Sequence, residues 1–373
     1  IRAFGNEKYE EKRFDETNES YAEVAKKLNK LMAISQPLFF FLLNIAIIVI
    51  FWISSKMINV GTLQVGQLVA FIEYLFHAMF SIMLFSMVFV MYPKAQVSAN
   101  RIMEVLNTEP IIKSPKNGIK DTENKGTIEF ENVSFTYPNG EEPVIKDVSF
   151  SGKKGEVIAF IGSTGSGKST LINLIPRFYD VTKGSIKIDG VDVRDYDLKY
   201  LRKKIGFIPQ KTLLFTGSIA NNIKFGKKDA EYKEVEDSAK IAQAYEFILN
   251  KPNKFDEIIT EGGSNVSGGQ KQRLSIARAI VRKPDIYIFD DSFSALDFKT
   301  DAILRKELRS ETKDAIVLIV AQRIGSIMDA DKIIVLNEGE VVGIGTHKEL
   351  IKNCPIYHEI ATSQLTEEEL ANE

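Results

Sequence analysis

The stretch Leu31–Ser55 contains no charged residue, and it limits what this chain can fold into more than any other feature. About 20 apolar residues in a helix cross the roughly 30 Å hydrocarbon layer of a membrane. A buried helix in a soluble core is the alternative. The length of the stretch and the aromatic Phe51 and Trp52 near its end favour a membrane span, because aromatic side chains gather at membrane interfaces.

A second apolar stretch, Val65–Tyr92, is also long enough to span, and Glu73 lies just before its uncharged core. The loop 59–64 between the stretches has no Lys or Arg. Basic residues flank the pair on both sides: Lys26, Lys27 and Lys30 before it, Lys94 and Arg101 after it. Because cytosolic segments carry the excess of positive charge, we expect both ends of this hairpin in the cytosol and the loop outside.

Residues 1–30 are charged and lack the apolar core of a signal peptide. Tyr21, Val24 and Leu28 are spaced as on one face of a helix, so we expect a cytosolic helix that continues into the first span. The chain starts with Ile1 in place of Met, and we expect it to begin partway through a longer protein.

Alternating strands and helices follow a polar linker at about residues 107–125. Strands are predicted at IEFENVSFTY, EVIAFIG, IYIFDD, AIVLIVA and KIIVL, with helical stretches between them. This order predicts a largely parallel sheet covered by helices on both faces.

Composition excludes several kinds of site. The net charge is -2 and no basic tract is present, so we expect no nucleic-acid partner. The single cysteine, Cys354, rules out a disulfide within the chain and a metal site of paired cysteines. We expect His347 to begin a helix, and the basic run Arg202–Lys204 to form a solvated helix face.

The sequence GSTGSGKST fits the pattern G-x-x-x-x-G-K-[ST] and lies between an apolar strand and a helix, the context that this pattern requires. Its residues are Gly162, Ser163, Thr164, Gly165, Ser166, Gly167, Lys168, Ser169 and Thr170. The glycines let backbone N–H groups turn inward and cradle phosphates at a helix N-terminus. Lys168 would neutralise phosphate charge and the Ser169 hydroxyl would bind Mg²⁺. The loop therefore predicts a nucleotide site.

Two further elements support a nucleotide site. Asp290 ends the apolar strand Ile286–Phe289, where a carboxylate can hold Mg²⁺ through water; alone, such an aspartate is usually a turn or a helix cap. The residues Ser267, Gly268, Gly269 and Gln270 would open a helix whose N-terminus binds an anion. That helix should end before Pro284. A flexible turn is the alternative for the two glycines.

Together these motifs resemble the ATP-binding cassette (ABC) family, specifically exporters in which the membrane and ATPase parts share one polypeptide. The resemblance covers nearly the whole chain. Residues 266–270, VSGGQ, are similar to the family signature LSGGQ except at Val266. The resemblance implies that Tyr137 stacks on adenine, that Gln210 contacts Mg²⁺ and links to the membrane domain, and that Asp297 belongs to the D-loop.

The resemblance also implies an all-α transmembrane hairpin followed by an α/β P-loop NTPase domain with a helical subdomain and an antiparallel β subdomain. The predicted domains are 1–125, the end of the transmembrane domain with helices at about 31–55 and 65–92 plus a linker; 126–365, the nucleotide-binding domain; and 366–373, a polar tail. The implied cofactors are ATP and Mg²⁺. ATP would contact Tyr137, 162–170, Gln210, 267–270 and Asp297, and Mg²⁺ would contact Ser169, Gln210 and Asp290.

Two positions depart from the family pattern. Asp291 stands where the family has a glutamate that orients or deprotonates the attacking water, so the carboxylate is withdrawn by roughly one bond length. A misplacement of ~1 Å can cost about 10²-fold in rate. Gln322 replaces the switch histidine; it can hydrogen-bond a phosphate but cannot carry a proton near neutral pH. We take these two as the catalytic positions and expect slow hydrolysis of bound ATP.

ABC ATPases close as two cassettes that sandwich two ATP molecules, so a chain with one cassette requires a second half-transporter. We favour a heterodimer over a homodimer. The expected function is ATP-driven export of an amphipathic drug, lipid or peptide across a bilayer. The protein would be a multi-pass protein of the bacterial plasma membrane with a cytosolic ATPase domain. An active homodimer and a non-hydrolysing nucleotide-gated subunit remain alternatives, and the spans argue against a soluble ABC ATPase.

Overall fold

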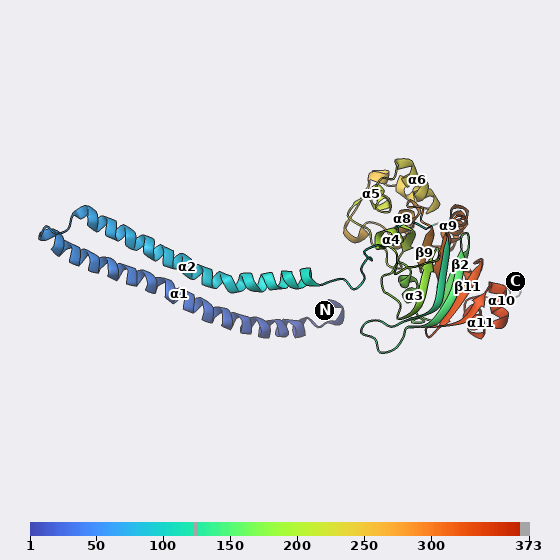
Figure 1. Ribbon diagram of the computed structural model, residues 1–373, viewed down its shortest axis with the longest axis horizontal. Coiled ribbons are helices and arrows are strands. Elements are labelled where there is room, and N and C mark those ends of the chain that lie inside the picture. The colour runs from blue at the N-terminus through green and yellow to red at the C-terminus, as the bar shows by residue number, and fades with distance from the viewer. Residues whose placement is uncertain (123–125, 366–373) are drawn as a thin grey trace. The chain divides into compact units, whose positions relative to one another are not determined.

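The computed structural model describes residues 1–122 and 126–365 (Figure 1). The predicted polar tail, residues 366–373, lies outside this part of the chain. The chain divides into two compact units, Ile1–Glu109 and Pro110–Glu373.

The first unit is a hairpin of two long helices that lie side by side (Figure 1). They are α1 (Glu7–Asn59) and α2 (Val65–Asn107). Helix α1 joins the charged N-terminal segment to the first apolar stretch without a break, which confirms the predicted continuous helix. Many apolar side chains of the hairpin face outward; Trp52, for example, is 64% exposed. A continuous apolar surface of this kind is typical of a membrane or protein contact.

A six-stranded sheet forms the centre of the second unit, in the order β12-β11-β3-β10-β9-β6. Its strands are β3 (Val157–Gly162), β6 (Ile205–Ile208), β9 (Ile286–Asp290), β10 (Ile316–Val320), β11 (Lys332–Asn337) and β12 (Glu340–Gly345). All neighbours pair in parallel except β11 and β12. The largely parallel sheet is confirmed, and burial on both faces explains the apolar runs of its central strands β3, β9 and β10.

Alternate residues of the central strands enter two separate apolar cores. Ala159 and Ile161 of β3 face a core to which α8 (Gly268–Ile280), α9 (Phe298–Glu311), α10 (His347–Asn353) and α11 (Pro355–Thr362) contribute, and which continues into the helices inserted between β6 and β9. Ile158 and Phe160 face the other core, which holds α3 (Lys168–Leu174), α4 (Leu198–Lys203) and a second sheet.

The second sheet is antiparallel, with the order β2-β1-β4-β5. Its strands are β1 (Thr127–Phe135), β2 (Ile145–Lys153), β4 (Lys183–Ile188) and β5 (Val191–Asp192). This sheet confirms the antiparallel β subdomain that the resemblance implies. The expectation that helices alone cover both faces of the central sheet is wrong: this sheet shares the second face with α3, because alternate apolar residues of β1 point into the same core.

A helical part is inserted between β6 and β9 and lies at the top of the second unit in Figure 1. It contains α5 (Ile219–Lys224), α6 (Tyr232–Ile241), α7 (Tyr245–Leu249), α8 and the short pair β7 (Gly217–Ser218) and β8 (Ile258–Ile259). Helix α8 is the helix predicted after Ser267. It ends at Ile280, before Pro284, as expected.

The division between the units falls within the polar linker expected at about residues 107–125, near its start. Residues of the linker pack on the second unit: the Ile119 N–H donates to Asp195 O at 3.0 Å, and the Leu198 N–H donates to Ser114 Oγ at 2.8 Å. These bonds tie the linker to the segment that leads into α4, so the structure places the division at Glu109/Pro110.

The prediction of a solvated basic face at Arg202–Lys204 is wrong for Lys204. The Lys204 Nζ lies 2.7 Å from Asp189 Oδ2 and 3.0 Å from Asp285 Oδ2, and its side chain is only 5% exposed. Burial alone would lower the pKa of this ammonium, but its hydrogen bonds to the two carboxylates outweigh burial and raise the pKa. Lys204 is therefore an internal ion-pair residue.

Candidate nucleotide-binding site

The phosphate loop connects the end of β3 to the start of α3, as its sequence predicts. Two of its glycines are required by the backbone. A Cβ on Gly162 would lie 2.0 Å from Leu336 O, and one on Gly167, whose φ is +95°, would lie 2.7 Å from Ile145 Cδ1. No other residue fits these positions without moving the chain.

Lys168 lies inside the loop that it follows. Its Nζ donates to Gly162 O at 2.9 Å, to Ser163 O at 2.7 Å and to Ser166 Oγ at 3.3 Å. Burial lowers the pKa of Lys168, and Asp291 and Asp290 partly oppose that shift. The ammonium group is thus held in the concavity where the loop would receive phosphate.

Ser169 and Asp290 meet across the sheet edge. The Ser169 Oγ donates to Asp290 Oδ1 at 2.8 Å. Burial raises the pKa of Asp290, and the hydrogen bond from Ser169 offsets part of that rise. Magnesium binds oxygen ligands through one or two carboxylates plus phosphates. A hydroxyl and a carboxylate already in contact fit that ion, so two of the three predicted metal ligands lie together where the loop meets β9. The third, Gln210, contacts Asp291 through its amide nitrogen.

The carboxylate of Asp291 accepts hydrogen bonds from two glutamine side chains. Gln322 Nε2 donates to Asp291 Oδ2 at 2.7 Å, and Gln210 Nε2 donates to the same oxygen at 3.0 Å. The three residues follow β9, β10 and β6, whose carboxyl ends meet at one edge of the sheet. Burial raises the pKa of Asp291, and the hydrogen bond from Gln210 opposes this shift. The structure therefore brings both predicted catalytic positions into direct contact.

Tyr137 lies beside the phosphate loop. Its hydroxyl is 3.0 Å from Thr170 Oγ1, and its ring meets the edges of Phe135 and Tyr179 with centroids 4.9 and 5.2 Å apart. Tyr179 is a site residue that the sequence reasoning missed. Its only signal is an aromatic residue a short way after the phosphate-loop helix, and no motif marks it.

The signature residues begin α8 but do not join the phosphate loop. Ser267 caps the helix by accepting from the Gln270 N–H at 3.3 Å, and Gln270 Oε1 accepts from the Ser267 N–H at 3.1 Å. Across residues 1–122 and 126–365, no hydrogen bond links 267–270 to 162–170. Asp297 caps α9 by accepting from the Thr300 N–H at 3.0 Å.

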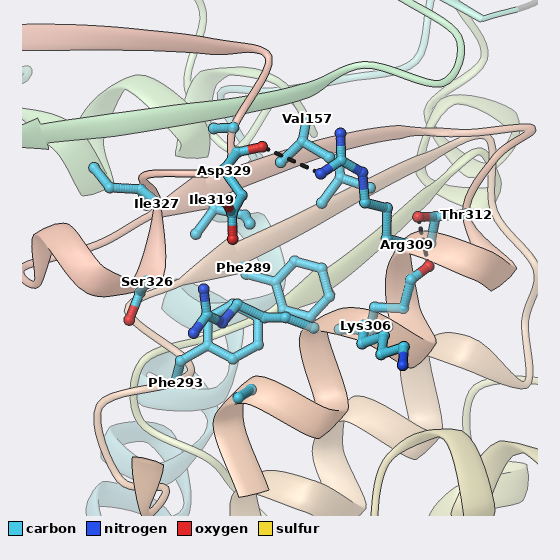
Figure 2. Close-up of a pocket in the computed structure, with 15 residues that line it drawn as sticks. Val157, Phe289, Phe293, Lys306, Arg309, Thr312, Ile319, Ser326, Ile327 and Asp329 are labelled. Atoms are coloured by element: carbon cyan, nitrogen blue, oxygen red, sulfur yellow. Dashed lines mark hydrogen bonds between the residues drawn. The ribbon is translucent and has the colours of Figure 1, made fainter. Parts of the chain in front are cut away.

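A cavity of about 290 Å³ lies behind the catalytic positions, between α9 and residues 326–330. Figure 2 shows Phe289 and Phe293 among the residues that line it, together with Lys306 and Arg309 of α9. None of the predicted site residues lines it. Phe293 and Ser326 also line the small space next to Asp291 and Gln322, so this cavity backs the catalytic pair.

Two family models match the chain: an ABC transporter transmembrane region at residues 1–92 and an ABC transporter domain at residues 145–294. The first segment is thus similar to the membrane region of ABC transporters, and the second is similar to their ATP-binding domain. Its fold is similar to that of a bacterial Atm1-family ABC exporter with ATP bound, with TM-score 0.87 and 30% identity over 98% of this chain and 65% of that one.

Two curated ABC relatives show the same extent of similarity. An uncharacterized ABC transporter ATP-binding protein of Mycobacterium tuberculosis is 38% identical over 98% of this chain and 63% of its own length. The putative multidrug export ATP-binding/permease protein YgaD of Bacillus subtilis is 35% identical over 98% of this chain and 63% of its own length. This chain thus spans less than two thirds of the length of these relatives.

Proposed function

We propose that this chain is the ATP-binding part of an ABC exporter half-transporter that couples ATP binding and hydrolysis to transport across a membrane. The carrying observation is that the phosphate loop, Asp290 and Asp291 meet at one sheet edge, with Ser169 Oγ 2.8 Å from Asp290 Oδ1. The membrane region on the same chain supplies helices whose movement the ATPase could drive. The relatives described as multidrug exporters support export of an amphipathic compound.

The residues of the loop would bind ATP in distinct ways. Lys168 would exchange its carbonyl partners for phosphate oxygens, and the N–H groups of 163–169 would cradle the phosphate chain. Tyr137 would stack on adenine, with Tyr179 supporting its ring from the edge. Ser169 and Asp290 would hold Mg²⁺, and the side-chain oxygen of Gln210 would be a further ligand. The ion would neutralise charge on the phosphates.

Hydrolysis at this site should be slow. Asp291 stands at the position of the family's general base, and its side chain is one methylene shorter than the family glutamate. Loss of a well-placed general base costs about 10²–10⁴-fold. Gln322 cannot accept a proton in place of the family histidine. The cassette would therefore bind ATP firmly and turn it over slowly.

The partner should be a second half-transporter of different sequence. Gly268 and Gly269 of the signature are intact, and α8 begins with a well-capped, open N-terminus. Within residues 1–122 and 126–365, no hydrogen bond joins that end to this chain's own phosphate loop, which supports a role for it at the ATP of a partner cassette. A partner with Glu at the position that corresponds to Asp291, and His at the position that corresponds to Gln322, would then give one fast site.

The membrane placement follows from charge. We propose a multi-pass protein with the turn 59–64 outside and the ATPase domain in the cytosol, in keeping with the basic residues at the cytosolic ends of the spans.

The rate of ATP hydrolysis tests whether this chain works in a heterodimer. The full-length chain is reconstituted in liposomes alone and together with the product of its neighbouring reading frame. We expect the pair to hydrolyse ATP at least about ten times faster than the chain alone, and to move the dye Hoechst 33342 only as a pair. Equal ATPase rates would refute the heterodimer and favour an active homodimer. ATP binding with no turnover in either sample would indicate a nucleotide-gated subunit.

A further inference from the structure

The carboxylate of Asp291 is clamped through one of its two oxygens. Gln322 and Gln210 both donate to Oδ2, at 2.7 and 3.0 Å. A carboxylate oxygen has two lone-pair sites, so two donors fill Oδ2. Neither glutamine uses Oδ1. Rotation of the carboxylate about its last bond would break both hydrogen bonds, and the two amides therefore fix its plane.

The two donors come from segments that are themselves held. The Ala321 N–H donates to Phe160 O at 3.1 Å, which ties the residue before Gln322 to the central sheet. After it, Gln364 Nε2 donates to Gln322 O at 2.8 Å, and the Ile324 N–H donates to Gln364 Oε1 at 2.9 Å. The backbone of Gln322 is thus fastened on both sides, and its side chain can hold Asp291 in place.

Asp291 itself adopts an unusual backbone conformation. Its φ is +48°, in the left-handed region, while its N–H donates to Val320 O at 3.0 Å. An aspartate tolerates this region better than most residues do. The side chain consequently leaves the end of β9 in a direction set by the backbone, and the glutamines need only fix its final rotation.

We propose that Gln322 is a positioning residue that acts through Asp291: it holds Oδ2 so that Oδ1 is presented to the attacking water, with Gln210 as the second support. This inference rests on the proposed ATPase function and deepens it. Asp291 and Gln322 then form a matched pair, because an amide donates to the carboxylate without any change of protonation, which an imidazole does only in one tautomer or when charged. The rival is that Gln322 contacts the phosphate directly and independently of Asp291.

A double-mutant cycle separates these roles. In the full-length transporter we expect Gln322→Met, which keeps the side-chain length but removes the donor, to lower kcat by about tenfold or more with KM within about twofold, since a hydrogen bond to a charged group is lost. In an Asp291→Ala background the same substitution should change kcat by less than about twofold, because the group through which it acts is gone. Gln322→His, which keeps a donor and can also carry a proton, should restore kcat to at least the wild-type value. Gln322→Glu should be at least as slow as Gln322→Met.

The outcome that overturns the inference is an equal loss from Gln322→Met in both backgrounds, or a rise in KM with kcat unchanged. The four proteins of the cycle (wild type, Gln322→Met, Asp291→Ala and the double variant) are also melted without nucleotide. There, Gln322→Met should lower the Tm only when Asp291 is present, and equal shifts in both backgrounds would refute the clamp. The melting measurement needs no turnover, so it still tests the inference if the wild-type chain hydrolyses ATP no faster than the Lys168→Ala blank. That lack of hydrolysis would count against the proposed function alone.

Discussion

Replacing Asp189 with asparagine should destabilise the ATPase unit strongly. The Asp189 side chain is 1% exposed, and its Oδ2 lies 2.7 Å from Lys204 Nζ. Its Oδ1 accepts from the N–H groups of Gly126 at 2.6 Å and Thr127 at 3.1 Å. Asparagine keeps one oxygen for the backbone donors but turns an N–H₂ group toward the ammonium. The substitution therefore breaks a buried ion pair from one side.

The size of the effect follows from what remains around Lys204. Removing one partner of a buried pair costs about 3–5 kcal/mol. Asp285 still holds the ammonium at 3.0 Å but is 38% exposed, so we expect the low end, about 3 kcal/mol. The substitution adds no backbone strain to the loss of stability, because asparagine tolerates the φ of +54° at this position. For a domain of this size the loss corresponds to a fall in Tm of roughly 6–12 °C.

Calorimetry or circular dichroism of the full-length protein measures this change. The control is Asp314→Asn, which removes the exposed pair between Lys154 and Asp314, 2.9 Å apart with side chains 49% and 91% exposed; it should cost under about 0.5 kcal/mol. Adding Lys204→Met to Asp189→Asn should recover most of the stability. A Tm for Asp189→Asn within about 1 °C of wild type would refute the assignment of a buried pair.

Three further predictions concern binding, topology and packing. Lys168→Ala should weaken ATP binding at least about tenfold in calorimetry, since a charged hydrogen bond to phosphate is lost; equal affinities would refute the site. A cysteine at Asn59 should react with an impermeant thiol reagent on intact cells, and labelling only after permeabilisation would overturn the topology. Ala330→Leu should fill part of the cavity in Figure 2 and raise the Tm by about 2–4 °C, at about 25 cal/mol per Å² of apolar surface buried; a lower Tm would show that the cavity walls are rigid.

The elements that sequence reasoning predicted well are those set by local pattern. Continuous apolar runs predict buried parallel strands, and β3, β9, β10 and β11 form where those runs lie. The phosphate loop is also local, because glycines at fixed positions and a following helix determine its shape. Ser267 and Gln270 predict a helix start for the same reason, and their side chains form a reciprocal cap.

The features that sequence reasoning missed depend on distant partners. Lys204 reads as a surface lysine beside Arg202 and Lys203, and only the carboxylates of Asp189 and Asp285 make its burial possible. The contact between Asp291 and Gln322 could not be predicted either. Both residues were identified singly, but their distance depends on side-chain rotation after two different strands. The same holds for Tyr179 beside Tyr137.

The central claim is that this chain's own ATP site is built to bind and is slow to hydrolyse because of Asp291 and Gln322. Its most direct test is the ATPase rate of the Asp291→Glu, Gln322→His double variant against wild type, with Lys168→Ala as the blank. We expect the double variant to be faster by at least about tenfold, since a displacement of ~1 Å at the base can cost about 10²-fold. A double variant no faster than wild type would contradict the account.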